Sequence, residues 1–161
     1  MASTVTAQNL EVSITESITL AGTNYNQTKS LVIPSIKEVY KRVVRCIDDT
    51  DCTIATFRTA TNTADNALDL ENVKYIRVTN LDDTNPMNLS LQITAAEDGV
   101  ADMSVTHLVG AAQSLILYTV HDGLAVSDAN ATIVTALNDL ESILVDPLSE
   151  NIDVEIFIAS I

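Results

Sequence analysis

The chain has few of the residues that nucleic-acid sites use. It contains no Trp, 4% aromatic residues, and 8 Lys and Arg against 22 Asp and Glu, which gives a formal net charge of -14. Binding to nucleic-acid phosphates needs clustered Lys and Arg, and stacking on bases needs aromatic rings. We therefore expect no nucleic-acid partner.

Glycine is scarce, and long apolar runs are missing. The 4 glycines form no phosphate-binding loop of the dinucleotide or Walker type, and no Gly-x-Ser-x-Gly nucleophile elbow occurs. The longest apolar stretches, such as 115–118, are far too short to cross a bilayer. The first residues lack the basic and apolar regions of a secretory signal. We expect no cofactor and no membrane contact, and synthesis in a cytoplasm.

Few side chains offer catalytic or metal-binding chemistry. His107 and His121 are the only histidines, and Asp122-Gly123 after the second one is typical of a turn. The acidic clusters 48–51 and 82–83 do not follow the alternating loop pattern that supplies calcium with six or more oxygens. The sequence therefore predicts no enzyme, no catalytic residues and no metal site.

Cys46 and Cys52 are the only cysteines, and two thiols cannot complete a zinc site. They flank a predicted turn at 47–51, where opposed residues of a hairpin come close enough for a disulfide. Two reduced, partly buried thiols are the alternative, which we favour for a protein made in the cytoplasm.

Charge is divided unevenly along the chain. Residues 1–77 carry 8 basic and 9 acidic side chains, whereas residues 78–161 carry 13 acidic side chains and no basic one. Such a dipolar body suits contacts between copies or docking on a charged surface. The basic region around Lys41, Arg42 and Arg45 is our candidate docking face.

Alternation of apolar and polar residues dominates the chain and predicts β-strands. We expect a half-buried strand over 10–15, with Ile18 and Leu20 on the same face, then a loop over 21–29. Pro34 is expected to end a short strand, since proline cannot donate to a strand ladder. Further strands are predicted in these ranges: 30–33, 73–79, 87–94, 103–108, 114–120 (a nearly all-apolar central strand) and 152–158.

Two segments have a mixed pattern. Residues 36–47 place apolar side chains on one helical face, but the valines and the turn after them favour a hairpin of strands 39–47 and 52–58. Between 128 and 144, Val134, Leu137, Leu140 and Leu144 have helical spacing, with Pro147 beyond. We expect a short helix there. Turns every 8 to 12 residues predict an all-β antiparallel β-sandwich or jelly roll of about eight strands.

Four stretches together resemble small structural proteins of tailed, marine bacteriophages. They are Val39-Tyr40-Lys41-Arg42-Val43-Val44, Val73 to Asn85, the run from His107 through Leu117, and Val154-Glu155-Ile156-Phe157-Ile158-Ala159-Ser160. The resemblance covers most of the chain in order. It implies a β-sandwich component of the virion, present in many copies.

The sequence thus predicts a flexible N-terminal arm at 1–8 and a single β-sandwich domain at 9–161. As a function we expect a capsid decoration protein that binds the outer surface of the phage head and stabilises it. Its partners would be the major capsid protein and further copies of itself, with a trimer favoured. A tail or neck component and a host-glycan-binding module are the alternatives. The glycan module would use the loops 21–29 and 59–72.

Overall fold

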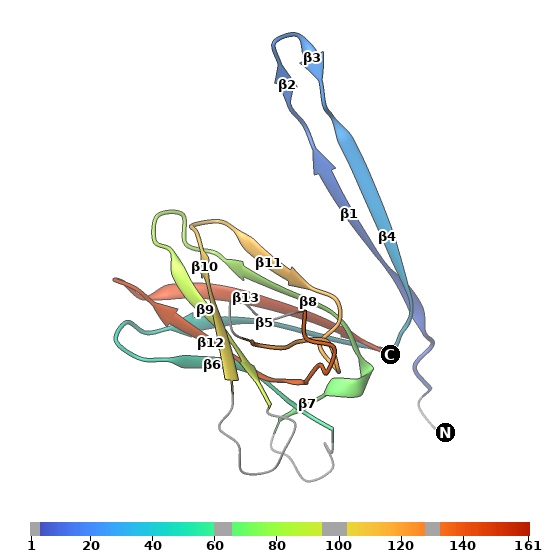
Figure 1. The fold of residues 1–161 in the computed structure, drawn as a ribbon, viewed down its shortest axis with the longest axis vertical. Coiled ribbons are helices and arrows are strands. Elements are labelled where there is room, and N and C mark those ends of the chain that lie inside the picture. The colour runs from blue at the N-terminus through green and yellow to red at the C-terminus, as the bar shows by residue number, and fades with distance from the viewer. Residues whose placement is uncertain (1–3, 60–65, 95–102, 128–132) are drawn as a thin grey trace.

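Strands make up nearly all of the regular structure in the computed structural model of the chain. The structure describes residues 4–59, 66–94, 103–127 and 133–161. Two sheets pack face to face, and a long two-stranded hairpin projects away from them (Figure 1). The predicted all-β sandwich class is confirmed. Part of the predicted loop over 59–72, residues 95–102 between two predicted strands, and the first residues of the predicted helix lie outside the described residues.

The first sheet has five strands. In spatial order they are β10 (Met103–Val109), β9 (Met87–Ile93), β12 (Leu140–Pro147), β6 (Cys52–Arg58) and the short β7 (Leu68–Asp69). All neighbours are antiparallel except β6 and β7, which are parallel. A 3₁₀ turn at Leu70–Asn72 leads from β7 into the second sheet.

The second sheet has four antiparallel strands. Their order is β11 (Ser114–Leu117), β8 (Val73–Asn80), β13 (Ile152–Ser160) and β5 (Glu38–Cys46). β13 is central and pairs along its whole length with β5 and nearly so with β8. The last strand therefore holds this sheet together. No described helix is long and apolar enough to span a membrane.

The core lies between the two sheets and consists mainly of aliphatic side chains. Strict alternation in β13 turns Ile152, Val154, Ile156 and Ile158 inward, and all four are buried. β9, which was predicted as a strand over 87–94, does the same from the opposite sheet with Leu89, Leu91 and Ile93. Burial of these apolar faces is the main favourable term for the sandwich.

The projecting hairpin, residues Gln8–Ile36, is the feature that the sequence did not reveal. β1 (Gln8–Glu16) pairs antiparallel with β4 (Gln27–Ile36), and β2 (Thr19–Leu20) pairs with β3 (Thr23–Asn24) at the tip. Its strands belong to neither sheet of the sandwich. Figure 1 shows it rising from the end of the body at which the C-terminus lies.

Two expectations for this segment were wrong. The predicted loop over 21–29 contains β3 and the start of β4, and the strand predicted to stop before Pro34 runs on to Ile36. Proline is tolerated here because β4 has only β1 as its partner, and the register shifts next to Pro34. Ser35, with φ 65, lies at the same irregularity.

Over the described residues 133–144 the helix predicted near the C-terminus is not formed, and Leu140–Pro147 form strand β12 instead. Pairing with β9 shifts register between Leu140 and Ser142, which marks a β-bulge at that point. The bulge lets Leu140 and Ile143, three residues apart, both enter the core. The helical spacing of Leu137, Leu140 and Leu144 therefore does not mark a buried face, since Leu137 is exposed and Leu144 is only partly buried.

Two predictions of strand neighbours also fail. β5 and β6 are consecutive strands but lie in opposite sheets, so residues 47–51 form an arch from one sheet to the other rather than a hairpin turn. The apolar run at 114–120 forms β11, which is an edge strand and not a central one, and it ends at Leu117.

The packing predicts the effect of a core truncation. Ile156→Ala removes a fully buried side chain from the central strand, and we expect it to lower the free energy of unfolding by about 2–5 kcal/mol. Leu148→Ala, at an exposed loop position, should change it by less than about 0.5 kcal/mol. Urea unfolding followed by circular dichroism measures both. Equal effects of the two variants would contradict the described core.

Candidate interaction surface

The projecting hairpin has one apolar face and one polar face. Cross-strand pairs place Leu10 beside Ile33 and Val12 beside Leu31 on one side, followed outward by Ile14 beside Lys29. On the other side a hydrogen bond of 3.0 Å joins the hydroxyls of Ser13 and Ser30, and one of 3.2 Å joins those of Thr15 and Thr28.

The body covers the apolar face only at the base of the hairpin. Leu10, Val12, Ile33 and Ile36 pack with Tyr75, Ile116, Phe157 and Ala159 on the outer face of the four-stranded sheet. The rings of Tyr75 and Phe157 meet edge to face with centroids 6.0 Å apart. A backbone hydrogen bond of 2.9 Å from Lys37 N to Ser160 O anchors the end of the hairpin.

Beyond the base, the same face is open to solvent. Ile14 is 48% exposed and Leu31 is 43% exposed, and towards the tip Ile18, Leu20 and Tyr25 are also exposed. Exposed aliphatic side chains continuous with a buried cluster indicate an interaction surface. The alternation over 10–15 correctly predicted that the apolar side chains share one face of a strand. It could not show that the sandwich covers only half of that face.

The angle between the hairpin and the sheet forms an open cleft of about 300 Å³. Its lining residues are Leu10, Glu11, Val12, Ser13, Lys41, Tyr75, Arg77 and Phe157. Lys41 lies on the outer face of β5 between Val39 and Val43, which are 54% and 53% exposed. The cleft is thus continuous with an apolar strip on the edge strand.

The three predicted docking residues do not share one face. Alternation along β5 puts Lys41 and Arg45 on its outer side and Arg42 on the other. Lys41 Nζ lies 2.9 Å from Glu155 Oε2, and Arg45 Nη1 lies 3.5 Å from Asp153 Oδ1. Within the described residues Arg42 makes no ion pair. It is therefore the basic side chain of this group whose charge stays free for a partner.

Glu155 is the centre of the ion pairs on the outer face. Its carboxylate accepts hydrogen bonds from Lys41 and from Arg77, whose guanidinium also lies over the Phe157 ring, 5.8 Å from the centroid. The hydrogen bond from Lys41 and the two nearby positive charges hold the pKa of Glu155 below its ordinary value, against a smaller effect of burial. These pairs neutralise charge beside the apolar strip.

The two cysteines are free thiols that face each other across the arch between the sheets. Cys46 is fully buried and Cys52 is partly buried. Burial, and after it a hydrogen bond with the Cys52 thiol, raise the pKa of Cys46 to about 12. The Cys46 thiol is therefore protonated at neutral pH and is a poor nucleophile.

The two histidines lie in different surroundings. His107 is exposed on β10. His121 has Nδ1 2.9 Å from Asp139 Oδ1 and Nε2 3.7 Å from Asp122 Oδ2, so both ring nitrogens face carboxylates rather than a hydroxyl or thiol nucleophile. One ligand atom from each of the three residues lies within 4.8 Å of the others. The cluster offers a cation three ligands, the number of protein ligands in an open catalytic zinc site but fewer than a structural zinc site or a calcium site uses.

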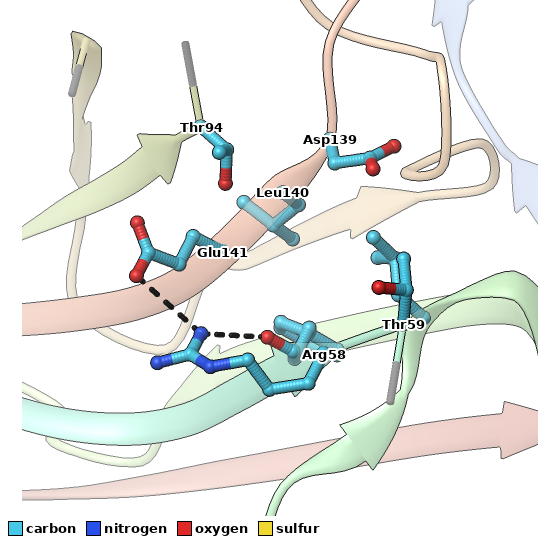
Figure 2. Close-up of a pocket in the computed structure, with 8 residues that line it drawn as sticks. Arg58, Thr59, Thr94, Asp139, Leu140 and Glu141 are labelled. Carbon is cyan, nitrogen blue, oxygen red and sulfur yellow. Dashed lines mark hydrogen bonds and ion pairs between the residues drawn. The ribbon is translucent and has the colours of Figure 1, made fainter. Parts of the chain in front are cut away.

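A hollow of about 320 Å³ lies at the end of β6 and β12 (Figure 2). Leu140 forms part of its wall, and Arg58 Nη1 lies 3.4 Å from Glu141 Oε1 and donates to Phe57 O. Thr59 and Thr94 on its rim precede the undescribed ranges 60–65 and 95–102. Because Arg58 is paired with Glu141, which also lines the hollow, the charge of Arg58 is not free for a ligand.

The acidic cluster at 82–83 has a local structural role. Asp82 Oδ1 accepts hydrogen bonds from the backbone N–H groups of Asn85 and Thr84, at 2.6 and 2.8 Å. These bonds hold the pKa of Asp82 below its ordinary value. Buried Asn80 donates to the Asn85 and Gly110 carbonyls and fastens the same turn to the neighbouring loop. Asp82 therefore shapes a turn.

The ion pairs predict a pH-dependent effect of Glu155→Gln. A carboxyl with a lowered folded-state pKa stabilises the fold above its ordinary pKa of 4.5, and that contribution is lost as the pH falls through the lowered value. At pH 7 the variant should be less stable by up to about 1 kcal/mol. In urea unfolding from pH 7 downward, the gap should begin to close below pH 4.5. A gap that stays constant down to acid pH would contradict the prediction, and Glu150→Gln is the exposed control.

The two thiols should differ in reactivity. At pH 8 a thiol-specific reagent should label Cys52 in the folded protein and leave Cys46 unmodified, because the Cys46 thiol is buried and its pKa is about 12. In denaturant both should react. Mass spectrometry of the labelled protein measures this. Rapid labelling of both in the folded state, or of neither in denaturant without reductant, would contradict the described pair of free thiols.

No family model, no curated protein and no solved structure matches the chain. The function therefore has to be inferred from the surface of the chain itself. Within the described residues, the hairpin carries an apolar face that a single copy of the chain covers only at its base.

Proposed function

We propose that the chain is a virion structural protein, a decoration protein that binds the outside of a tailed-phage head and stabilises it. The projecting hairpin is the observation that carries the proposal. It extends a large contact surface away from the sandwich, and its exposed apolar side chains, Ile14 and Leu31 among them, suit burial in an assembly.

The body supports the same function. Its inward-facing side chains are aliphatic, and the hollows formed by described residues are small and open. Such a sandwich provides shape and contact area rather than a reaction site. The resemblance of the strand sequences to phage structural proteins is our reason for naming a phage head as the assembly and the major capsid protein as the partner.

Copy number in purified particles tests this function. Quantitative mass spectrometry of virions should find hundreds of copies per particle if the chain decorates the head. About six to twelve copies would instead indicate a ring in the tail or neck. Absence of the chain from virions would overturn the proposal.

The free basic side chain of β5 provides a sharper test of docking on the head. Arg42→Glu should weaken binding to undecorated capsids by about threefold to tenfold at low salt, and the difference should shrink at high salt. Lys74→Glu is the matched control, since Lys74 is tied to its own chain by a 2.9 Å hydrogen bond to Glu71 O. Equal binding of wild type and the Arg42 variant, measured by co-sedimentation, would remove this surface from the docking model.

A further inference from the structure

We propose that the hairpin of one copy packs, through Ile14 and Leu31, on the strip formed by Val39 and Val43 of β5 in a second copy. This inference deepens the proposed function by naming the partner of the hairpin. It requires no capsid, so it can be tested separately.

Continuity of the apolar face is the first argument. The basal half of this face, with Leu10 and Val12, is covered by the outer face of the chain's own four-stranded sheet. The distal half is exposed and of mixed chemistry: Ile14 lies beside Lys29, the pair Glu16 and Gln27 follows on the same face, and Ile18, Leu20 and Tyr25 lie exposed towards the tip. A two-stranded hairpin alone is only marginally stable in water. A second outer sheet face of the same kind would complete the covering.

The acceptor strip has matching properties. Val39 and Val43 are among the exposed apolar side chains of the sheet, and they flank Lys41 at the open cleft. Lys41 and Arg45 are already paired with acids on β13, so they need not lose their partners when the strip is covered. In the described part of the chain, 9 of the 19 exposed large apolar side chains lie within residues 5–43.

The distribution of charge also favours the hairpin and β5 as the region of contact between copies. Residues 1–47 carry five basic and three acidic side chains, whereas residues 48–161 carry three basic and nineteen acidic ones. Two chains of net charge -14 repel each other over most of their surfaces. The hairpin and β5 form the part of the chain without net negative charge, so a contact there meets the least repulsion.

The area is sufficient for a modest dimer. A distal hairpin face about 25 Å long and about 10 Å wide, buried reciprocally in a two-fold arrangement, removes on the order of 1,000 Å² from water, near the lower limit for a specific interface. We therefore expect association at about micromolar to 100 micromolar concentrations.

Sedimentation velocity of the full chain over this range tests the inference. Wild type should self-associate, and Ile14→Asp with Leu31→Asp should be monomeric. Ser13→Asp with Thr28→Asp is the matched control, because it adds the same charge at diagonal positions on the opposite, polar face. A monomeric wild type, or an apolar-face variant that associates as wild type does, would overturn the inference. A hairpin that needs a capsid or another protein as its partner gives the first of these results.

Mixing two variants tests the acceptor. Val39→Lys with Val43→Lys should also be monomeric, yet mixing it with the aspartate hairpin variant should give a heterodimer, because one contact is then wild type and the other sets aspartates against lysines. Failure to form it would contradict the assignment of β5. If circular dichroism shows that the lysine variant is unfolded, Val39→Thr with Val43→Thr replaces it, and weaker self-association than wild type is then the expected result.

The response to salt separates this contact from docking on a charged head. Raising NaCl from about 50 mM to about 500 mM should tighten self-association, because salt screens the repulsion between acidic chains while the contact itself is apolar. Weaker association at high salt would contradict an apolar contact. Self-association without capsid binding would refute only the proposed function. Capsid binding without self-association would refute only this inference.

Discussion

One apolar face that the molecule covers only in part governs the behaviour of this chain. Tyr75 and Phe157 on the outer side of the four-stranded sheet hold the base of the hairpin, and the sandwich ends before the face does. A hairpin of this length has no second layer of its own. Its distal half therefore depends on contacts from outside the chain, and the surface for those contacts is built in.

The sandwich provides the rigid support for that arrangement. Its central strand β13 pairs with β5 on one side and with β8 on the other. β5 follows the hairpin directly in the chain. β8 carries Tyr75, whose ring packs against the base of the hairpin. The central strand β13 also supplies Asp153 and Glu155, which form ion pairs with Arg45 and Lys41 of β5. Fold, charge pairing and the position of the hairpin are thus linked through one strand.

Much of the sandwich could be predicted from alternation alone. β9 and β13 follow a period of two without interruption, and their inward residues are those expected. β12 was mistaken for a helix because Leu137, Leu140 and Leu144 have helical spacing, yet of these three only Leu140 is buried, and a bulge brings Ile143 into the core beside it. The arch at 47–51 was mistaken for a hairpin turn, since a five-residue connection fits both and the choice depends on pairing with distant strands.

The interaction surface was only partly predictable, since its basic residues were evident but their partners, Asp153 and Glu155, lie more than 100 positions away in the chain. Hydrogen exchange of the hairpin amides at two protein concentrations tests the central claim most directly. We predict fast exchange over the distal part of β1 and β4 in the dilute protein and marked protection there at high concentration, with β13 unchanged. Equal exchange of the hairpin at both concentrations would contradict the account.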